Sequence, residues 1–503
     1  MTVPTGRRLP GIRRDILANL LGKGWVAITS FVCVPVFVHQ LGLEAYGLVG
    51  LFVTLQATLV LLDFGFSTAL NRAVASAGGG PLGEEVTGLA AGLERLFAGL
   101  ALLVVLVAWL CAAPLAEDWL RLGPTARGEA VSALRLMGVA IALQLPYLLY
   151  AGALAGLGRQ VALNGLLAAC TTLRFGGAAV LLGFQPDLQV FFGWQVLAAL
   201  LQVAWARSLF TRTLRKRSSN PDARPALPRA HLAFAGGVGA TAALGVVLTQ
   251  LDKLMLSRLL PMPQFAAYSL AWTLASVLLL LAGPVVAAYF PRLSGEASRP
   301  GADPGPTYHQ GCQVLALAVV PAGVTLVALP GHALALWLGD TADPGPMAAL
   351  LRWLVLGTLL NTLAQMPHAL QLAHGRPQLG VAANLIMVTL VVPSLLAAVE
   401  GAGAIGAAWV WVGLNALYLG LGVPLMHRWL LRGQGLHWWL HAALLPATAA
   451  AAVVLPAGAV LASPEGRSAG TAAGLLLCYL GAVLATAVAV PASRGWLTTR
   501  LRG

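Results

Sequence analysis

The stretch AYGLVGLFVTLQATLVLLDFGFSTALNR, residues 45–72, is almost wholly apolar, yet it places one carboxylate, Asp63, among those residues. A helix needs about 20 mostly apolar residues to cross the hydrocarbon of a bilayer, where only internally satisfied backbones are stable. Similar runs recur along all 503 residues, of which 58% are hydrophobic and 10% charged, with a mean hydropathy of +0.80. The sequence therefore predicts an all-α polytopic membrane protein.

We expect fourteen transmembrane helices joined by short connections. Their predicted ranges are 16-40, 45-70, 93-115, 132-156, 161-184, 188-208, 231-259, 264-290, 311-338, 349-373, 378-399, 403-426, 438-461 and 469-491. The longest connection, RSLFTRTLRKRSSNPDARPALPR from Arg207, is basic and contains prolines, which is typical of a linker.

The distribution of Lys and Arg predicts the orientation, because cytoplasmic ends carry an excess of these residues. Starting the N-terminus inside the cell places 22 of the 31 Lys and Arg at cytoplasmic ends and 7 at outside ends. Both termini are therefore expected in the cytoplasm. Anionic lipid headgroups and topology account for the net charge of +13, so we expect no nucleic-acid partner.

An internal repeat divides the chain. Arg14, Gly22 and Gly24 recur with the same spacing as Arg229, Gly237 and Gly239, and Arg135 with Arg159 recurs as Arg352 with Arg376. The offset of about 217 residues spans an even number of helices, so the copies would be related by an axis along the membrane normal. We expect a six-helix bundle ending in the linker (1-218), a second six-helix bundle (219-432) and two additional helices with a cytoplasmic tail (433-503).

Charges within the spans are costly in lipid, so each is a candidate functional residue. Lys23, between Gly22 and Gly24, either binds substrate or extends to the cytoplasmic surface. Arg174 lies near the middle of a span and either binds substrate or forms an interior ion pair. Asp63 is expected to face a cleft or a basic partner, with Lys23 as one candidate.

Further residues are candidates for gating or coupling. They are Asp63, Arg72, Asp252 and Lys253. As helical neighbours, Asp252 and Lys253 point about 100° apart, so one could face a cavity while the other reaches the interface.

Uncharged polar residues form the remaining candidates. Gln144, Asn361, Gln365 and His368 could contact sugar hydroxyls, although hydrogen bonds between helices explain them equally well. His437 and His441 have the i, i+4 spacing of some metal ligands but lack acidic or cysteine neighbours, so no metal is expected. The five scattered cysteines predict no disulfide, and no phosphate-binding or nucleotide-binding motif predicts a cofactor.

The N-terminal quarter resembles Wzx-type flippases, the polysaccharide-export branch of the multidrug/oligosaccharidyl-lipid/polysaccharide (MOP) exporter superfamily. The resemblance rests on LGLEAYGLVGLF, LLDFGFSTALNR, LDKLMLSRLL and FPRLS, and more loosely on the repeat and helix count. It implies alternating-access transport of a polyprenyl-pyrophosphate-linked oligosaccharide repeat unit, as in O-antigen synthesis, from the cytoplasmic to the periplasmic leaflet. It also implies a cationic cavity, into which Lys23 and Arg174 fit, and membrane lipid, a polysaccharide polymerase and chain-length proteins as partners.

Three alternatives remain open. A cation-coupled multidrug exporter of the same superfamily would favour acidic residues in the cavity. A peptidoglycan-precursor flippase would be expected to show arginine-rich first helices and a DAF stretch, neither of which is found here. A polysaccharide polymerase or acyltransferase would need a large outside loop or a catalytic cluster, so a non-enzymatic role is expected.

Overall fold

The computed structural model describes residues 10–77, 80–123, 126–217, 224–299, 301–339, 344–375, 377–461 and 469–491. Within these ranges the chain is almost entirely helical, with β-structure limited to isolated bridge residues such as the pair Arg121 and Pro261. The prediction of an all-α polytopic membrane protein is confirmed. The chain forms two compact units, Met1–Pro263 and Gln264–Gly503, which are described separately.

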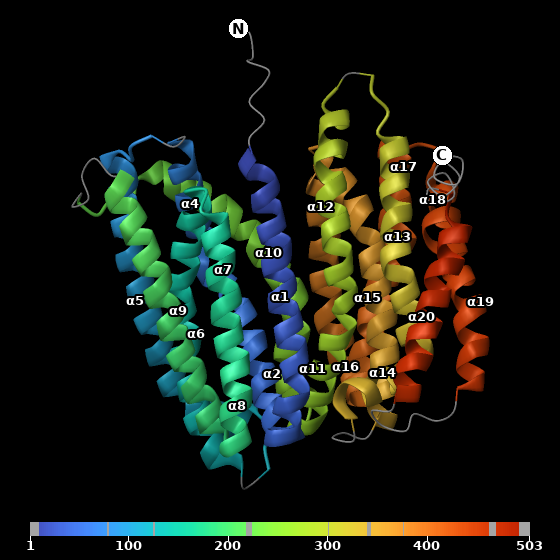
Figure 1. The fold of residues 1–503 in the computed structure, drawn as a ribbon, viewed down its shortest axis with the longest axis horizontal. Coiled ribbons are helices and arrows are strands. Elements are labelled where there is room, and N and C mark those ends of the chain that lie inside the picture. The colour runs from blue at the N-terminus through green and yellow to red at the C-terminus, as the bar shows by residue number, and fades with distance from the viewer. Residues whose placement is uncertain are drawn as a thin grey trace. The chain divides into compact units, whose positions relative to one another are not determined.

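The first unit contains ten α-helices and two short π-helices in its described residues. They are α1 (Pro10–Leu41), α2 (Leu43–Thr58), α3 (Val60–Asp63), α4 (Phe66–Ser76), α5 (Glu84–Pro114), η1 (Leu115–Trp119), α6 (Ala126–Gly156), α7 (Gln160–Thr171), η2 (Thr172–Gly176), α8 (Gly177–Phe184), α9 (Leu188–Arg217) and α10 (Arg229–Leu259). Figure 1 shows the long helices of this unit lying roughly along one direction. The α6 helix packs against α4, α5 and α9.

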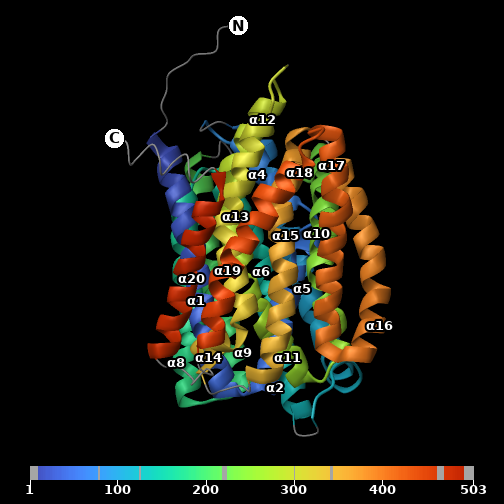
Figure 2. The ribbon, with the colours of Figure 1, turned by 90° about the vertical axis from the view of Figure 1, so that its right-hand side faces the viewer.

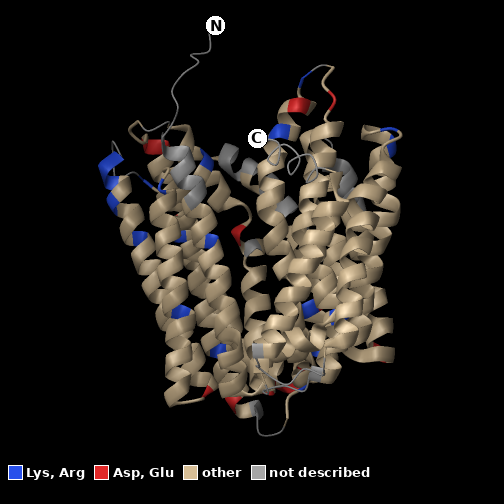
Figure 3. Cartoon of the chain, turned by 45° about the vertical axis from the view of Figure 1, so that its right-hand side comes forward, with Lys and Arg blue, Asp and Glu red and all other residues tan. Residues whose placement is uncertain are grey.

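The outward sides of these helices are apolar. On α5, Leu102, Leu106 and Leu110 are 71%, 53% and 66% exposed and recur every four residues, which places them on one face. Such a stripe would favour aggregation in water, but it suits contact with lipid tails. Charged side chains are sparse along the middle of the helices (Figure 3), as the cost of burying charge in hydrocarbon requires.

The second unit begins within α11 and contains the following elements: α11 (Met262–Ala275), α12 (Val277–Ala297), α13 (Gly305–Ala328), α14 (Pro330–Leu338), α15 (Pro344–Ala373), α16 (Pro377–Leu417), η4 (Tyr418–Gly422), α17 (Val423–Leu430), α18 (Gly435–Trp438), η5 (Trp439–Leu444), α19 (Leu445–Val460) and α20 (Ala469–Ala489). The last two helices, α19 and α20, pack against each other and against α13 (Figure 2).

Twelve helices in the described part of the chain are long and apolar enough to cross a membrane. The predicted spans 378-399 and 403-426 fall in one continuous run, Asn384–Leu430, which Gly403 interrupts with φ 56° and ψ −136°. The predicted span 231-259 corresponds to α10, several of whose side chains lie outside the described residues. The count of fourteen therefore stays a prediction.

The α10 helix belongs to the first unit because it packs against α2, α3 and α4. This unit therefore extends beyond residue 218, where the linker and the repeat place the expected boundary. The predicted division into 1-218, 219-432 and 433-503 follows the sequence repeat, whereas the two compact units follow the packing of the helices. The predicted division stays a prediction.

Candidate functional site

Arg174 lies within the π-helix η2, near the middle of the predicted span 161-184. Its Nη2 donates a 2.9 Å hydrogen bond to Oε1 of Gln56 on α2, and its Nε donates to Oε1 of Gln195 on α9. A π-helical turn inserts an extra residue into a helix, and such turns are frequent at functional sites. Three segments of the first unit thus converge on one guanidinium group.

Aromatic rings surround the same guanidinium. The Arg174 Cζ lies 5.2 Å from the ring centroid of Phe52 and 5.5 Å from that of Phe175. Phe52 packs edge-on against Phe192, with 5.4 Å between ring centroids. Ring faces attract a cation, so these contacts offset part of the cost of removing the guanidinium from water.

The Arg174 charge is not neutralised by an acidic side chain. Among the described residues, no carboxylate oxygen lies within 4.0 Å of its guanidinium nitrogens. The Nε2 of Gln195, a second donor in the same place, is buried without a hydrogen-bond partner. A cation beside an unused N–H donor suits an anion with several acceptor oxygens, because guanidinium groups bind phosphate and carboxylate with charge-assisted hydrogen bonds.

Lys23, the second predicted cavity cation, is exposed on α1. Its neighbour Gly22 packs against α7, where an added Cβ would lie 2.7 Å from Oδ1 of Asn164. The Nδ2 of Asn164 donates a 2.5 Å hydrogen bond to Oδ1 of Asn19. The α1 helix is therefore held to α7 beside Lys23, while the Lys23 side chain itself stays accessible.

Asp63 is 8% exposed, and its Oδ1 accepts hydrogen bonds from the backbone N–H of Ser67, at 3.1 Å, and from the Ser67 hydroxyl. Within the described residues, no ion pair joins Asp63 to Lys23 or to any other basic side chain. The expected basic partner is therefore not found, because the carboxylate binds its own chain four residues later. Arg72 is exposed on α4.

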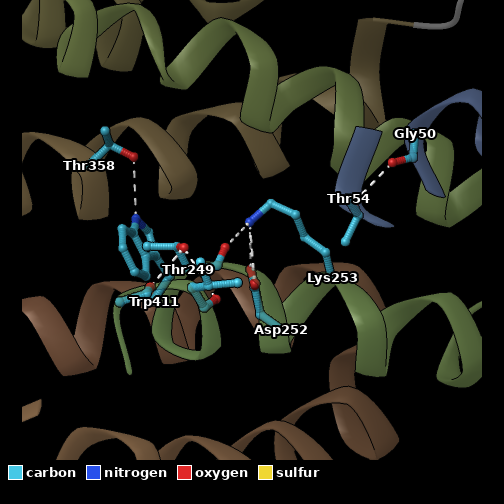
Figure 4. Close-up of polar contacts among 9 residues, drawn as sticks. Gly50, Thr54, Thr249, Asp252, Lys253, Thr358 and Trp411 are labelled. Atoms are coloured by element: carbon cyan, nitrogen blue, oxygen red, sulfur yellow. Dashed lines mark hydrogen bonds and ion pairs between the residues drawn. The ribbon is translucent and has the colours of Figure 1, made fainter. Parts of the chain in front are cut away.

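Asp252 and Lys253 form an ion pair on α10. The Lys253 Nζ lies 3.2 Å from Oδ1 of Asp252 and donates a 2.8 Å hydrogen bond to the carbonyl oxygen of Thr249 (Figure 4). Lys253 is only 5% exposed. The long Lys253 side chain thus binds its own helix, through its neighbour Asp252 and the backbone one turn earlier.

The predicted uncharged candidates lie in both units. In the first unit, Gln144 on α6 is 7% exposed. In the second, Asn361, Gln365 and His368 follow one another at helical spacing on α15. The Nδ2 of Asn361 donates a 2.8 Å hydrogen bond to Oδ1 of Asn415 on α16, which is the helix-to-helix alternative for that residue. Near it, the Trp411 indole N–H donates to the Thr358 hydroxyl at 3.2 Å (Figure 4).

Two polar groups were not anticipated. The first joins α5, α6 and α9, where the Tyr150 hydroxyl donates a 2.7 Å hydrogen bond to Oε1 of Glu94, and Arg207 Nε lies 3.6 Å from the same oxygen. A glutamate ten residues into α5 was the available signal for this group. Gln56, which accepts a hydrogen bond from Arg174, was also missed, although it is a lone amide in an apolar run.

The second group adds His309 to the histidine pair of the sequence, His437 and His441, in the second unit. The His437 ring lies 4.6 Å from that of His309 and 4.2 Å from that of His441, measured between ring centroids. Among the described residues, no group of three or more His, Cys, Asp or Glu side chains is arranged to hold a metal ion. The i, i+4 pair of the sequence is thus part of a cluster of three histidine rings, with one edge-on and one tilted contact.

This helical membrane protein matches a known protein family. Residues 12–295, more than half of the chain, match the model of a family described as polysaccharide biosynthesis protein. The chain belongs to this family. No curated protein matched the polysaccharide biosynthesis protein described here.

Solved structures share the fold of this polysaccharide biosynthesis protein. The lipid II flippase MurJ in an inward closed conformation is similar with a TM-score of 0.71 and 11% identity, covering 94% of this chain and 98% of MurJ. An inward-facing multidrug resistance MATE family transporter of the MOP superfamily has a TM-score of 0.66 and 14% identity, covering 85% of this chain and 96% of its own.

A MATE multidrug transporter, DinF-BH in complex with R6G, has a TM-score of 0.59 and 14% identity over 85% of this chain and 98% of its own. At these identities the likeness establishes the fold alone. Family and helices together support a multi-pass membrane protein of the polysaccharide biosynthesis family.

Proposed function

We propose that this protein is a Wzx-type flippase, which moves polyprenyl-pyrophosphate-linked oligosaccharide repeat units from the cytoplasmic to the periplasmic leaflet by alternating access. The family match supports a role in polysaccharide biosynthesis, and the fold is that of proteins described as a lipid flippase and as multidrug transporters. The proposal places the chain in the bacterial inner membrane with both termini in the cytoplasm. A polysaccharide polymerase and chain-length proteins would use its product.

The unneutralised guanidinium of Arg174 carries the proposal. Burying an isolated ionised group without a partner costs tens of kcal/mol in the limit of a dry apolar medium, so a diphosphate crosses a membrane only where cations compensate its charge. Arg174 offers such a charge within the first unit, and Gln195 adds an unused N–H donor. We assign Arg174 to the diphosphate and the exposed Lys23 to a second contact with it.

The glycan and the transport cycle require other residues. Gln144, Asn361, Gln365 and His368 have hydroxyl-binding groups and are proposed to contact the sugars. The Asp252–Lys253 pair and Arg72 are proposed for gating, because a buried ion pair can be broken and re-formed between two conformations.

The decisive experiment follows the lipid-linked substrate in cells that lack the gene. Intact cells and spheroplasts assign the leaflet in which the complete polyprenyl-pyrophosphate oligosaccharide accumulates. We expect accumulation on the cytoplasmic side, with no surface polymer. Repeat units that reach the outer leaflet unpolymerised would indicate the enzyme alternative, and normal polysaccharide with new drug sensitivity would indicate a multidrug exporter.

Complementation then tests Arg174 itself. Arg174→Met preserves much of the apolar stem but removes the charge, and we expect it to abolish surface polysaccharide while membrane levels of the protein stay within about twofold of wild type. Arg352→Gln is the matched control, because Arg352 is exposed and its Nε donates to a backbone carbonyl, that of Val327. Normal surface polysaccharide with Arg174→Met would contradict the assignment.

A further inference from the structure

The second predicted span is broken at two consecutive residues. The α3 helix ends at Asp63 and α4 begins at Phe66, while Phe64 (φ 47°, ψ 20°) and Gly65 (φ 78°, ψ 8°) both adopt the left-handed conformation. Gly65 accepts this conformation readily, but a bulky residue such as Phe64 rarely does. Phe64 is also 50% exposed, so burial of its ring does not account for the backbone conformation.

The Asp63 carboxylate caps the helix that restarts after the break. Its Oδ1 accepts the backbone N–H of Ser67, the second residue of α4, and also the Ser67 hydroxyl. The first turn of a helix has free N–H groups, and a carboxylate placed just before it satisfies one of them. The first backbone hydrogen bond of α4 runs from Ala69 N to Gly65 O at 2.9 Å, so the cap lies directly beside the start of the helix.

Glycines hold the break from two sides. On α6, Gly152 and Gly156 are four residues apart, and added Cβ atoms would collide with the carbonyl oxygens of Ser67, at 2.6 Å, and of Asn71. On α10, an added Cβ at Gly239 would lie 2.5 Å from the carbonyl carbon of Phe64. Small residues at such spacing let membrane helices approach backbone to backbone.

We propose that Asp63 is a positioning residue, which caps α4 and thereby fixes Phe64–Gly65 as a pivot between two halves of the second span. Its hydrogen-bond geometry, rather than its charge, is what the span requires. Without the cap, Phe64 and Gly65 return to right-handed geometry and the span approaches one uninterrupted helix. This role goes beyond the proposed flippase function and replaces the expected role of Asp63 in coupling.

A distance measurement across the break tests the pivot. Spin labels are attached at Val53→Cys on α2 and Ser76→Cys on α4, because both positions are exposed. The background carries Cys111→Ser, which removes the exposed native cysteine; the other four are buried. An uninterrupted helix would separate these 23 residues by about 35 Å, which pulsed electron paramagnetic resonance can measure in the purified full-length protein.

We expect Asp63→Asn to keep the wild-type distance, because Asn caps helices about as well as Asp, whereas Ala does not. Asp63→Ala should increase the population near the distance of an uninterrupted helix by about tenfold, the scale of a lost cap. Adding Phe64→Gly to Asp63→Ala should restore the wild-type distance, because glycine adopts the left-handed conformation without steric cost.

Three results would overturn the proposal. The first is a shifted distance in Asp63→Asn, and the second is no restoration of the distance by Phe64→Gly. The third is loss of transport in Asp63→Asn at an unchanged distance, which would show that the charge itself is required. The distances do not depend on the substrate, so a failure of the proposed function would leave this part of the test intact.

Discussion

Substituting Gly239 by Ala tests how closely α10 packs on the second span. A Cβ built at this position would lie 2.5, 2.6 and 2.9 Å from the carbonyl carbon, carbonyl oxygen and Cα of Phe64. These are backbone atoms, so no side-chain rotation can remove the overlap. Either α10 or the Phe64–Gly65 break must move.

The magnitude follows from comparison with Gly236, which lies one turn earlier on α10. An added Cβ at Gly236 meets nothing within 4 Å, so Gly236→Ala should stabilise the protein by about 0.5–1 kcal/mol through helix propensity alone. Gly239→Ala has the same propensity gain but incurs overpacking, which typically costs about 1–3 kcal/mol. The two variants should therefore differ by about 1–3 kcal/mol in their free energy of unfolding.

The measurement is reversible unfolding of the purified protein in mixed micelles at increasing sodium dodecyl sulfate, with Gly236→Ala as the matched control. Gly239→Ala should unfold at a lower detergent fraction than wild type, and Gly236→Ala at the same or a higher fraction. Equal unfolding midpoints for the two alanine variants would refute the close packing of α10 on Phe64.

Other predictions concern the contacts of Asp252 and Glu94 in the first unit. Asp252→Asn removes the ion pair of the nearly buried Lys253 and should destabilise the protein by about 3–5 kcal/mol in the same assay; adding Lys253→Met should recover most of this loss, and no recovery would contradict it. Glu94→Gln should cost less than about 1 kcal/mol, because Tyr150 can still donate to the amide oxygen and Arg207 is 63% exposed. A larger loss would show that the Glu94 charge is needed.

Hydropathy predicts the spans because the backbone in lipid must be helical, but it does not predict breaks within them. The sequence predicts one helix over residues 45–70, yet the backbone is left-handed at Phe64. The cap by Asp63 and the close packing of Gly239 on the Phe64 backbone outweigh the local helical preference. Gly403 was easier to anticipate, because the predicted spans 378-399 and 403-426 separate at this glycine.

In the candidate site, the sequence likewise predicts some residues but not their contacts. Arg174 could be selected from the sequence because a cation in an apolar run is costly wherever it faces. Its hydrogen bonds to Gln56 and Gln195 could not be predicted, since these residues lie 118 and 21 positions away and no periodicity connects them to Arg174. The pairing of Asp252 with Lys253 was missed because helical geometry fixes the Cβ direction, whereas a four-carbon side chain can return to its neighbour.

The packing of α10 determines where the chain can be cut or extended. The basic linker connects α9 to α10, which both belong to the first unit, so it is an internal loop of that unit. The chain passes into the second unit within α11, after a short turn where Met262 N donates a 3.2 Å hydrogen bond to Arg121 O. A reporter domain inserted near residue 220 would consequently interrupt the first unit, whereas the crossing into the second unit lies inside a helix and offers no loop for an insertion.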